Sequence, residues 1–544
     1  MSRQVLVLTG QISSGKSTLA NGLADRFGFT VLKTKEELDR LGRNLTHFDI
    51  AERGNMQEFG ESLDVKTNGA WVRDALLDLL ESLGPKGRVV VDAARISQQI
   101  EAIRFAIPDR VIHIHIHAPQ EELARRYKAR NKPGFKEFSS YEEASQNKTE
   151  KQVSDLSKIA DVVIDTTRCT EKDVVVRAAA HLGLYAREYL PLVDVIVGGE
   201  YGSEGKGHIA SYLAPEYDVL VRVGGPNAGH TVFDYPQTYT FHHLPSGTKS
   251  SNAHIVIGPG AVLGLDVLLK EISECKVQSS RLSISPHAMM IEDQDRESEK
   301  KLVRAIASTG QGVGAATARR ILGRAPELAT PQVRLAGDLQ ELKPFLRETQ
   351  EVLERAFADG KKILLEGTQG AGLSLYHGSY PHVTSRDTTV GGTLAEAGIS
   401  PRHLRRIVMV CRTYPIRVGD APESGNTSGS LSQPTTWKEI SIRSGIPEEQ
   451  LFSKERTSTT KRERRVGEFD WELIRRSTYL NGPTDVALTF ADYISKDNED
   501  ARRFEQLTEE TIRFVNEVER VTAASVSLIS TRFHSRSIID RRSW

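Results

Sequence analysis

The chain has 544 residues, with 72 lysines and arginines against 72 aspartates and glutamates, so its formal net charge is zero. Its length suggests two to four domains of roughly 100–200 residues each, and a content of 38% apolar and 26% charged residues excludes wholesale disorder. Zero net charge removes a whole-chain attraction to nucleic acid or to an anionic membrane, so we expect neither as a direct partner.

The three cysteines are far apart and form no CxxC pair, which excludes a disulfide framework and a cysteine zinc site. The N-terminal segment is too short and too quickly interrupted to be a signal peptide. No apolar run reaches the ~18–20 residues of a membrane span. We therefore expect a soluble, cytoplasmic protein.

The first third of the chain alternates predicted strands and helices. A β-branched run at 4–8 opens into a glycine-rich turn, and a helix follows at 17–27. Further strands are predicted at 88–91, 110–115 and 160–164, with a charged helix at 121–131 and a last helix plus linker at 171–190. Such alternation favours a mostly parallel sheet covered by helices on both faces. We assign residues 1–187 to this first domain.

The turn after the first strand carries a phosphate-binding motif. Residues 10–17 fit GxxxxGK[ST] and lie between a predicted strand and a predicted helix. Glycines such as Gly10 and Gly15 let backbone N–H groups wrap phosphates, Lys16 neutralises their charge, and Ser17 or Thr18 can hold Mg²⁺. The motif predicts a nucleoside triphosphate with Mg²⁺ as a ligand of this domain.

Five further residues of the first domain are candidates for a kinase site. Asp92 and Arg95 follow an apolar strand and can present a carboxylate and a guanidinium to an acceptor or to Mg²⁺. Arg125, Arg126 and Arg130 lie on the helix after the third predicted strand, where small-molecule kinases keep lid arginines that close over the transferring phosphate. A solvated basic helix is the alternative interpretation of these arginines.

The first domain resembles known kinases. The stretches 56–60 and 160–165, together with the phosphate loop, are similar to nucleoside- and deoxynucleoside-monophosphate kinases and to dephospho-coenzyme A kinases. The resemblance implies phosphoryl transfer from ATP to a small acceptor. It leaves the identity of the acceptor open.

A second unit of the same kind begins at the apolar run 193–197, which again opens into a glycine-rich turn. We assign it residues 191–544, and the fold class is then α/β, with two P-loop-type domains and mostly parallel sheets covered by helices. Residues 419–436 are small and polar and predict a surface loop. The charge-dense residues 454–465 have a solvated loop as their plainest interpretation.

Several motifs of the second unit occur together in one known order. They are GGEYGSEGKG at 198–207, NAGHT at 227–231, FHHLPSG at 241–247, STGQGVG at 308–314, EGTQG at 366–370 and YPHVTS at 380–385. From about residue 193 to the C-terminus the chain resembles adenylosuccinate synthetases. The resemblance implies a ligase that phosphorylates the 6-oxygen of a purine nucleotide and displaces the phosphate with the amino group of aspartate, using Mg²⁺ and ATP or GTP.

The resemblance also implies roles for individual residues. Gly205, Lys206 and Gly207 match the donor-phosphate loop, where amides and an ammonium suit a polyphosphate. His230 matches the acid that stabilises phosphoryl transfer, because an imidazolium offsets charge on the bridging oxygen. Gly229 matches a position whose carbonyl helps to hold Mg²⁺.

The acceptor nucleotide has its own matches. Asn227, Thr309, Gln369 and Thr384 match the site for the purine and its monophosphate, and Gln369 joins His230, Lys206 and Ser203 in the expected catalytic set. Arg324 is the nearest match to an arginine that reaches across a homodimer into the partner's acceptor site. A homodimer is therefore expected.

The same resemblance implies a function for the charge-dense segment 454–465. Thr459, Thr460, Arg462 and Arg464 match the aspartate-binding loop of the family. Two arginines two residues apart on an extended loop point the same way and can fork onto a dicarboxylate. Lys461 stands where the family has a glycine.

Ser203 departs from the family pattern. The family carries an aspartate there, which takes the proton from purine N1 and contacts Mg²⁺, whereas a serine hydroxyl is neither basic near neutral pH nor a strong metal ligand. Either the domain only binds nucleotide as a sensor, or the acceptor has changed, because a shorter side chain makes room for a 2-amino group. The substitution is a feature of phage-type 2-aminoadenylosuccinate synthetases, which use dGMP in place of IMP. We favour dGMP or GMP as acceptor and keep ordinary use of IMP as an alternative.

The donor base is left open between guanine and adenine. The family grips guanine with Thr-Lys-x-Asp, and this chain has Thr489-Phe490-Ala491-Asp492. Asp492 can still pair with guanine, while Phe490 replaces the lysine stem that covers the ring. ATP and GTP are both candidate phosphate donors.

Overall fold

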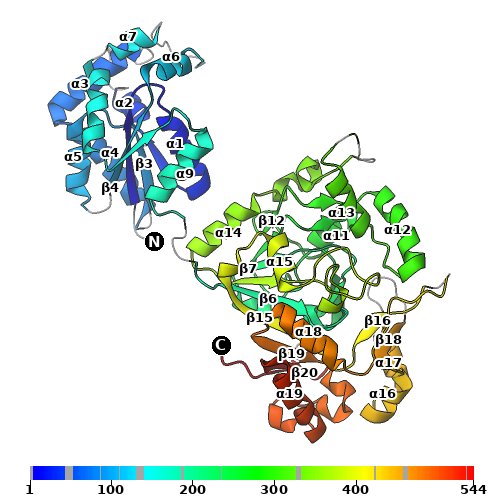
Figure 1. Cartoon of the computed structure of the whole chain (residues 1–544). Helices are drawn as coiled ribbons and strands as arrows, with labels where there is room; N and C mark the ends of the chain where they lie inside the picture. Colours follow the sequence, from blue (N-terminus) through cyan, green and yellow to red (C-terminus); the bar gives the residue numbers. More distant parts are fainter. Residues whose placement is uncertain are drawn as a thin grey trace. The chain divides into compact units, whose positions relative to one another are not determined.

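The computed structural model divides into two compact units, residues 1–187 and residues 188–544 (Figure 1). The structure describes residues 4–42, 53–85, 87–108, 111–129, 140–146, 148–185, 189–234, 236–325, 327, 332–421, 424–456, 463–534 and 536–544. Within these ranges, no helix combines the length and the apolar character that a membrane crossing requires.

The first unit contains a five-stranded sheet in the order β2-β3-β1-β4-β5. Its strands are β1 (Gln4–Gly10), β2 (Thr30–Lys33), β3 (Arg88–Asp92), β4 (Val111–His117) and β5 (Val162–Asp165). All four pairings are parallel, as predicted. The sequence analysis did not assign β2, which is short and only half-buried.

Helices connect these strands. They are α1 (Lys16–Phe27), α2 (Thr34–Gly42), α3 (Arg53–Thr67), α4 (Ala70–Leu83), α5 (Ser97–Ala106), α6 (Gln120–Lys128), α7 (Tyr141–Ser145), α8 (Lys148–Val153), the 3-10 helix η1 (Ser154–Ile159) and α9 (Glu171–His181).

The central strand β1 explains why helices cover both faces of the first sheet. Leu6 and Leu8 pack in one cluster with side chains of α1 and α9, whereas Val5 and Val7 pack in another with side chains of α4 and α5. Because successive side chains point to opposite faces, a strand that is apolar at every position must be buried twice.

The second unit is built on a nine-stranded sheet in the order β12-β10-β7-β14-β6-β15-β19-β20-β21. These strands are β6 (Val193–Gly198), β7 (Val219–Arg222), β10 (His254–Ile257), β12 (Leu282–Ile284), β14 (Ile363–Glu366), β15 (Leu404–Arg412), β19 (Asp485–Thr489), β20 (Ser525–Ser530) and β21 (Ile538–Asp540). Only β21 pairs antiparallel within this sheet, so the mostly parallel prediction is confirmed.

Shorter strands form three small ladders beside it. They are β8 (His230–Asp234) with β9 (Gln237–Phe241), β11 (Val262–Leu263) with β13 (Met289–Met290), and β18 (Arg464–Gly467) between β16 (Ile416–Val418) and β17 (Pro434–Thr435).

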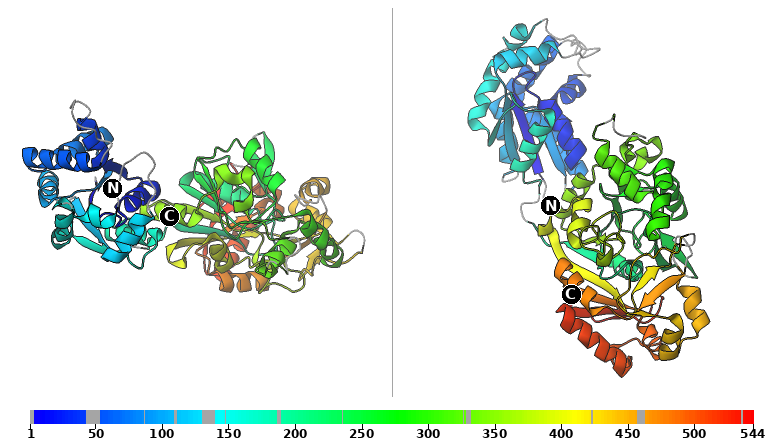
Figure 2. Two further views of the ribbon diagram at one scale, coloured as in Figure 1. Left: turned by 90° about the horizontal axis from the view of Figure 1, so that it is seen from above. Right: turned by 45° about the vertical axis from the view of Figure 1, so that its right-hand side comes forward.

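The α-helices of the second unit surround the large sheet, and Figure 2 gives two further views. They are α10 (Lys206–Leu213), α11 (Leu265–Glu274), α12 (Asp293–Ile306), α13 (Val313–Leu322), α14 (Thr349–Ala358), α15 (Val390–Ala397), α16 (Trp437–Ser444), α17 (Glu448–Lys454), α18 (Trp471–Asn481) and α19 (Glu509–Thr522). Short 3-10 helices are η2 (Ala214–Glu216), η4 (Ala336–Asp338), η5 (Gln340–Phe345), η6 (Ala371–Leu373), η7 (Pro401–His403), η8 (Ala491–Tyr493), η9 (Lys496–Asn498) and η10 (Phe504–Gln506).

Strand β6 plays the part that β1 plays in the first unit. Val195 and Val197 belong to the core formed with α14, α15, α18 and α19, while Ile196 packs with α10 on the opposite face. Each of these central strands is buried on both faces and is followed by a glycine loop and a helix.

Candidate nucleotide sites

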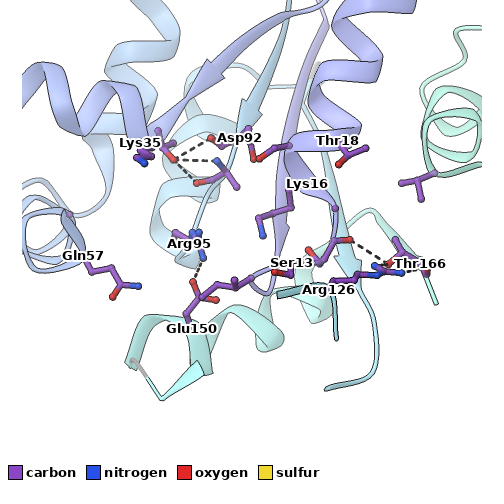
Figure 3. A pocket seen from close by; sticks show the side chains of 18 of the residues that line it. Ser13, Lys16, Thr18, Lys35, Gln57, Asp92, Arg95, Arg126, Glu150 and Thr166 are labelled. Atoms are coloured by element: carbon purple, nitrogen blue, oxygen red, sulfur yellow. Dashed lines mark hydrogen bonds and ion pairs between the residues drawn. The ribbon is translucent and has the colours of Figure 1, made fainter. Parts of the chain in front are cut away.

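The first site is a pocket of about 1010 Å³ lined by the ends of the strands of the first unit and the helices that follow them (Figure 3). It is lined by residues 12–18, which are the end of the phosphate loop and the first turn of α1. In open α/β sheets, ligands bind outside the carboxyl ends of the strands, and this pocket has that position.

The glycines of the first loop permit its tight turn. Gly10 and Gly15 have φ angles of +143° and +104°, and a Cβ at Gly10 would lie 2.1 Å from the carbonyl oxygen of Ile116. Lys16 donates from Nζ to the carbonyl oxygens of Gly10 and Gln11, each at 2.7 Å. Because α1 begins at Lys16, the N–H groups of its first turn lie at the pocket, which suits phosphate oxygens.

One wall of the pocket holds two of the predicted arginines. Arg126 donates to the hydroxyl and the carbonyl oxygen of Thr166, both at 2.9 Å, and to Glu122 at 2.7 Å. Arg125 also pairs with Glu122 at 2.7 Å but is largely exposed. Arg126 is thus fixed in the wall, whereas Arg125 lies at its rim; Arg130 is outside the described residues.

The opposite wall holds Asp92 and Arg95. Asp92 ends β3 in register with Leu8 of β1, so its side chain lies beside the phosphate loop (Figure 3). The adjoining turn is fixed by the Thr34 hydroxyl, which donates to the carbonyl oxygen of Ala93 at 3.0 Å. The guanidinium of Arg95 pairs with Glu150, which is buried.

Sequence reasoning missed a second carboxylate in this wall. Asp64 Oδ1 accepts hydrogen bonds from Trp71 Nε1 at 2.7 Å and from Gln99 Nε2 at 2.9 Å. Gln99 in turn accepts from the backbone N–H of Arg95 at 2.8 Å. Burial raises the pKa of Asp64, although the two hydrogen bonds oppose the shift. No motif links these positions, so only their packing reveals them.

The second site begins at the loop between β6 and α10. Gly205 has a φ angle of +86°, and the Lys206 ammonium pairs with the fully buried Glu204. Glu204 also accepts from the backbone N–H of Gly202 at 2.7 Å. A Cβ at Gly207 would lie 2.8 Å from Cβ of His230, so glycine there lets the two predicted elements approach.

His230 lies in a buried charged network. Its Nδ1 contacts Glu366, which also accepts from the Ser246 hydroxyl at 2.5 Å and from Arg222 at 3.3 Å. Burial and then Arg222 lower the pKa of His230 to about 4, although Glu366 opposes them. Burial opposes ionisation of Glu366, but Arg222 and His230 outweigh it and bring its pKa to about 2. Burial therefore favours the neutral form of an imidazole that Glu366 holds at Nδ1.

Three of the predicted acceptor residues meet at one point. Thr384 Oγ1 accepts from Gln369 Nε2 at 2.8 Å and from Asn227 Nδ2 at 3.4 Å. The side-chain amide oxygens of Asn227 and Gln369 are buried and have no hydrogen-bond partner among the described residues. A Cβ at Gly202 would lie 3.6 Å from Cα of Gln369, so this group packs against the phosphate loop.

The other two predicted acceptor residues lie apart from that group. Thr309 is in the turn between α12 and α13, where its carbonyl oxygen accepts from Gln311 at 3.3 Å. Arg324 follows α13, is exposed, and donates to the carbonyl oxygen of Ile321 at 2.8 Å. No hydrogen bond within the described ranges joins either side chain to Asn227, Gln369 or Thr384.

Arg464 is the described member of the predicted aspartate-binding loop, since Thr459, Thr460 and Arg462 lie outside the described residues. Arg464 donates to the Ser203 hydroxyl at 3.3 Å and pairs with Glu455 at 2.9 Å. Glu455 is 2% exposed, so the solvated-loop interpretation of 454–465 is wrong at this position. The carboxylate of Glu455 can be buried because the Arg464 guanidinium offsets its charge.

A second arginine completes this arrangement. Arg412 pairs with Glu455 at 2.9 Å and donates to the backbone carbonyl oxygen of Ser203 at 3.3 Å. Tyr493 donates to the same carboxylate at 2.7 Å. Glu455 therefore holds two guanidinium groups against Ser203. Sequence reasoning missed Arg412 and Glu455; a signal for Arg412 was its place at the end of an apolar strand.

The predicted donor-base residues differ in their surroundings. The ring of Phe490 lies 4.1 Å from the Arg412 guanidinium, so it packs against the arginine group. Asp492 is 2% exposed, and its Oδ1 is buried without a partner within the described part of the chain. Burial raises the pKa of Asp492 to about 7.

Comparison with known proteins gives a family match for a segment of each unit. Residues 195–330 and 332–499 match the family described as "Adenylosuccinate synthetase", and residues 5–155 match a family described as "AAA domain". The first unit is a P-loop, kinase-like domain.

Individual relatives cover the second unit. The adenylosuccinate synthetases of Methanocaldococcus jannaschii and Thermococcus onnurineus are 36% and 34% identical over 356 residues, which are 64% of this chain and 96% and 98% of the relatives. The solved structure of cyanophage S-2L succinoaminodeoxyadenylate synthetase, bound to dGMP and dATP as an energy donor, aligns with a TM-score of 0.54 and 26% identity over 65% of this chain and 96% of that chain. The Plasmodium falciparum adenylosuccinate synthetase, at 21% identity and a TM-score of 0.54 over 64% of this chain and 100% of that chain, shares the fold.

Adenylosuccinate synthetases ligate aspartate to a purine nucleotide with a nucleoside triphosphate and Mg²⁺. Among the described residues, no group of three or more histidine, cysteine, aspartate or glutamate side chains could hold a metal ion. Mg²⁺ is commonly held by a few protein oxygens, by water and by substrate phosphates, so its binding needs no such group. In the first unit the Ser17 hydroxyl lines the pocket and is an oxygen of the kind that Mg²⁺ takes. By its sequence match over more than half its length and by the arrangement of its second site, the chain belongs to the adenylosuccinate synthetase family.

Proposed function

We propose that the second unit joins L-aspartate to the 6-position of a purine nucleoside monophosphate, with dGMP or GMP as the acceptor, to give a 2-aminoadenylosuccinate-type product. The observation that carries the choice of acceptor is Ser203, whose small hydroxyl accepts from Arg464 at 3.3 Å. A serine leaves room for a 2-amino group and can accept its N–H. The cyanophage relative bound to dGMP supports the same acceptor.

The buried network around His230 supports the phosphoryl-transfer step. Glu366 fixes the imidazole through Nδ1, which leaves Nε2 as the atom available to the reacting oxygen. A bound polyanion would favour protonation of Nε2, and the imidazolium would then stabilise charge on that oxygen. Lys206 and the amides of Gly205 and Gly207 would bind the donor phosphates.

The arginines beside Ser203 support aspartate as the amine donor. Arg464 is the first residue of β18, and both Arg464 and Arg412 pair with Glu455. With Arg462 they would hold a dicarboxylate by charge-assisted hydrogen bonds. Thr459 and Thr460 would add hydroxyl donors to the same ligand.

Other parts of the proposal concern the donor and the assembly. Asp492 Oδ1 is buried and has no hydrogen-bond partner among the described residues, so it suits an N–H of a purine base, and Phe490 would pack near that base. The relative bound to dATP favours an adenine donor, with GTP as the alternative. Thr309 would contact the acceptor monophosphate, and Arg324 would do so across a homodimer.

We propose that the first unit is a kinase that transfers phosphate from ATP to a small molecule or nucleotide. Its open pocket combines a complete phosphate loop with Asp92. Ser17 or Thr18 would hold Mg²⁺, which would neutralise phosphate charge during transfer. Arg126, with Arg125 nearer the rim, would face the transferring group, and Arg130, which lies outside the described residues, would be the third lid arginine.

The first test measures phosphate release by the purified full chain with Mg²⁺ and aspartate. IMP, GMP, dGMP and dAMP are each paired with ATP or GTP, and the Lys16→Ala variant removes turnover by the first unit. We expect aspartate-dependent release with dGMP or GMP and not with IMP. Release with IMP alone supports an ordinary adenylosuccinate synthetase, and no aspartate-dependent release with any pair supports a nucleotide-binding regulator.

Ser203→Asp then tests the choice of acceptor. The new carboxylate can take the proton from purine N1 and would crowd a 2-amino group. We expect use of IMP to rise and use of dGMP to fall. Ser203→Ala is the matched control, because it removes the hydroxyl and leaves the space. If the aspartate variant still prefers dGMP, Ser203 does not select the acceptor.

A further inference from the structure

The first pocket has two chemically different halves on either side of Lys16. Figure 3 shows Thr166 and Arg126 on one side of Lys16, and Gln57, Arg95 and Glu150 on the other. The β4–β5 half contains two arginines, Glu122 and Glu171, so its charges balance, and it adds several hydroxyl groups and the first turn of α1, which suits a triphosphate-bearing donor. The β2–β3 half is therefore the place for the acceptor.

The acceptor half is lined mainly by acidic groups. Its charged lining residues that the structure describes are Glu61, Asp64, Asp92 and Glu150 against Lys35 and Arg95. Arg95 is already paired with Glu150. A phosphate monoester carries close to two negative charges at pH 7, and like charges at a few ångströms repel it. This half therefore favours an uncharged acceptor over a monophosphate.

Apolar and hydrogen-bonding groups in the same half suit a purine ring. Leu38, Met56 and Trp71 line it with apolar surface, and Trp71 is fixed through its indole N–H to Asp64. Since both hydrogen bonds to Asp64 reach Oδ1, its second carboxylate oxygen can accept an N–H of a base. Small-molecule sites commonly combine apolar walls with a few polar groups that fix orientation.

We infer that the acceptor of the first unit is an uncharged purine nucleoside, which is phosphorylated on a hydroxyl of its sugar; the inference rests on the proposed kinase function. Asp92 takes the hydroxyl proton, the sugar oxygen forms a bond to the γ-phosphorus of ATP, and the bond from that phosphorus to the β,γ-bridging oxygen breaks. ADP leaves with the electron pair.

The product places the two reactions in series. Phosphorylation on the sugar converts a purine nucleoside into a purine nucleoside monophosphate, which is the class of acceptor that the second unit uses. The first unit would thus supply the substrate of the ligation. Only the chemistry of substrate and product is needed for this order, and the arrangement of the two units plays no part in it.

The test uses the full chain with aspartate left out, so that the second unit cannot complete its ligation. ATP and Mg²⁺ are supplied with deoxyguanosine, guanosine or inosine, and in parallel with dGMP, GMP or IMP, and the nucleotide products are separated by anion exchange. We expect monophosphate from at least one nucleoside, at ten or more times the rate of diphosphate formation from any monophosphate. Adding Lys16→Ala should abolish the transfer.

Asp92→Asn tests the assigned base, with Asp78→Asn on the exposed face of α4 as the matched control. We expect Asp92→Asn to lower kcat about 100-fold or more, with ATP affinity and melting temperature unchanged, and Asp78→Asn to leave kcat unchanged. Preferred phosphorylation of a monophosphate, or full activity of Asp92→Asn, overturns the inference and leaves the kinase proposal standing. No Lys16-dependent transfer to any of the six compounds contradicts both.

Discussion

The two glycine loops begin alike and end in different electrostatic surroundings. Lys16 rests on backbone carbonyl oxygens at 2.7 Å beside an open pocket of about 1010 Å³. Lys206 pairs with the fully buried Glu204, in a region that also encloses Glu366 and Glu455 with their arginines. In the first loop, backbone carbonyl oxygens hold the lysine ammonium. In the second loop, the lysine ammonium belongs to a set of buried, paired charges.

This difference predicts how substitutions at each site change folding and turnover. Removing the partner of a buried ion leaves an unpaired, desolvated charge, which destabilises the fold. A charged group beside an open pocket can be hydrated when its partner is removed. Substitutions at the second site should therefore affect folding as well as turnover. Substitutions at the first site should affect turnover, with a smaller effect on folding.

The largest expected effect is on turnover at the second site. His230→Ala removes the group that stabilises phosphoryl transfer, so we expect aspartate-dependent phosphate release to fall by about 10²–10⁴-fold. Lys16-dependent nucleotide turnover in the same protein should be unchanged, which makes it the internal control. Equal loss of both activities would show that the variant is misfolded, and unchanged release would remove His230 from the mechanism.

The next effect is on stability. Glu455→Ala leaves the buried Arg412 without its carboxylate, so we expect the second unit to lose about 3–5 kcal/mol of unfolding free energy. Glu150→Ala, which unpairs the partly exposed Arg95, is the matched change in the first unit and should cost clearly less. Chemical denaturation followed by tryptophan fluorescence measures both. Similar losses would contradict the contrast between the two sites.

The third expected effect is a dependence of stability on pH. Burial lowers the pKa of His230 and His208 to about 4, and burial with Arg222 lowers that of His243 to about 3. The unfolded chain binds these protons at its ordinary pKa of about 6.5, so the unfolding free energy falls as the pH drops from about 6.5 towards 4.

Both units should show this loss, because burial also lowers the pKa of His113 and His115 in the first unit to about 4. Calorimetry at pH 7 and pH 5 measures it. His243→Gln should flatten the dependence, while substitution of the exposed His181 should leave it unchanged. A melting temperature that is constant between the two pH values would contradict the assignment.

Sequence reasoning predicted the elements that depend on neighbouring residues. Both central strands and both loop-to-helix transitions follow from apolar runs and glycines next to each other, and His230 follows from a motif. It could not predict Glu366 beside His230, because 136 residues separate them, or Arg412 beside Ser203, 209 residues away. Asp64, Gln99 and Arg95 likewise meet only through packing.

The sequence by itself determined that the protein has two phosphate loops, one family of ligation chemistry and a serine where that family has an aspartate. Loops of this kind are specified locally, since positive-φ glycines and the first turn of a helix need no distant partner. Only the tertiary structure decided which charges are paired, because burial and ion pairing depend on segments that folding brings together. Burial beside Arg222 favours neutral His230, ion pairing through Glu455 holds two arginines against Ser203, and packing leaves an acidic half in the pocket beside Lys16.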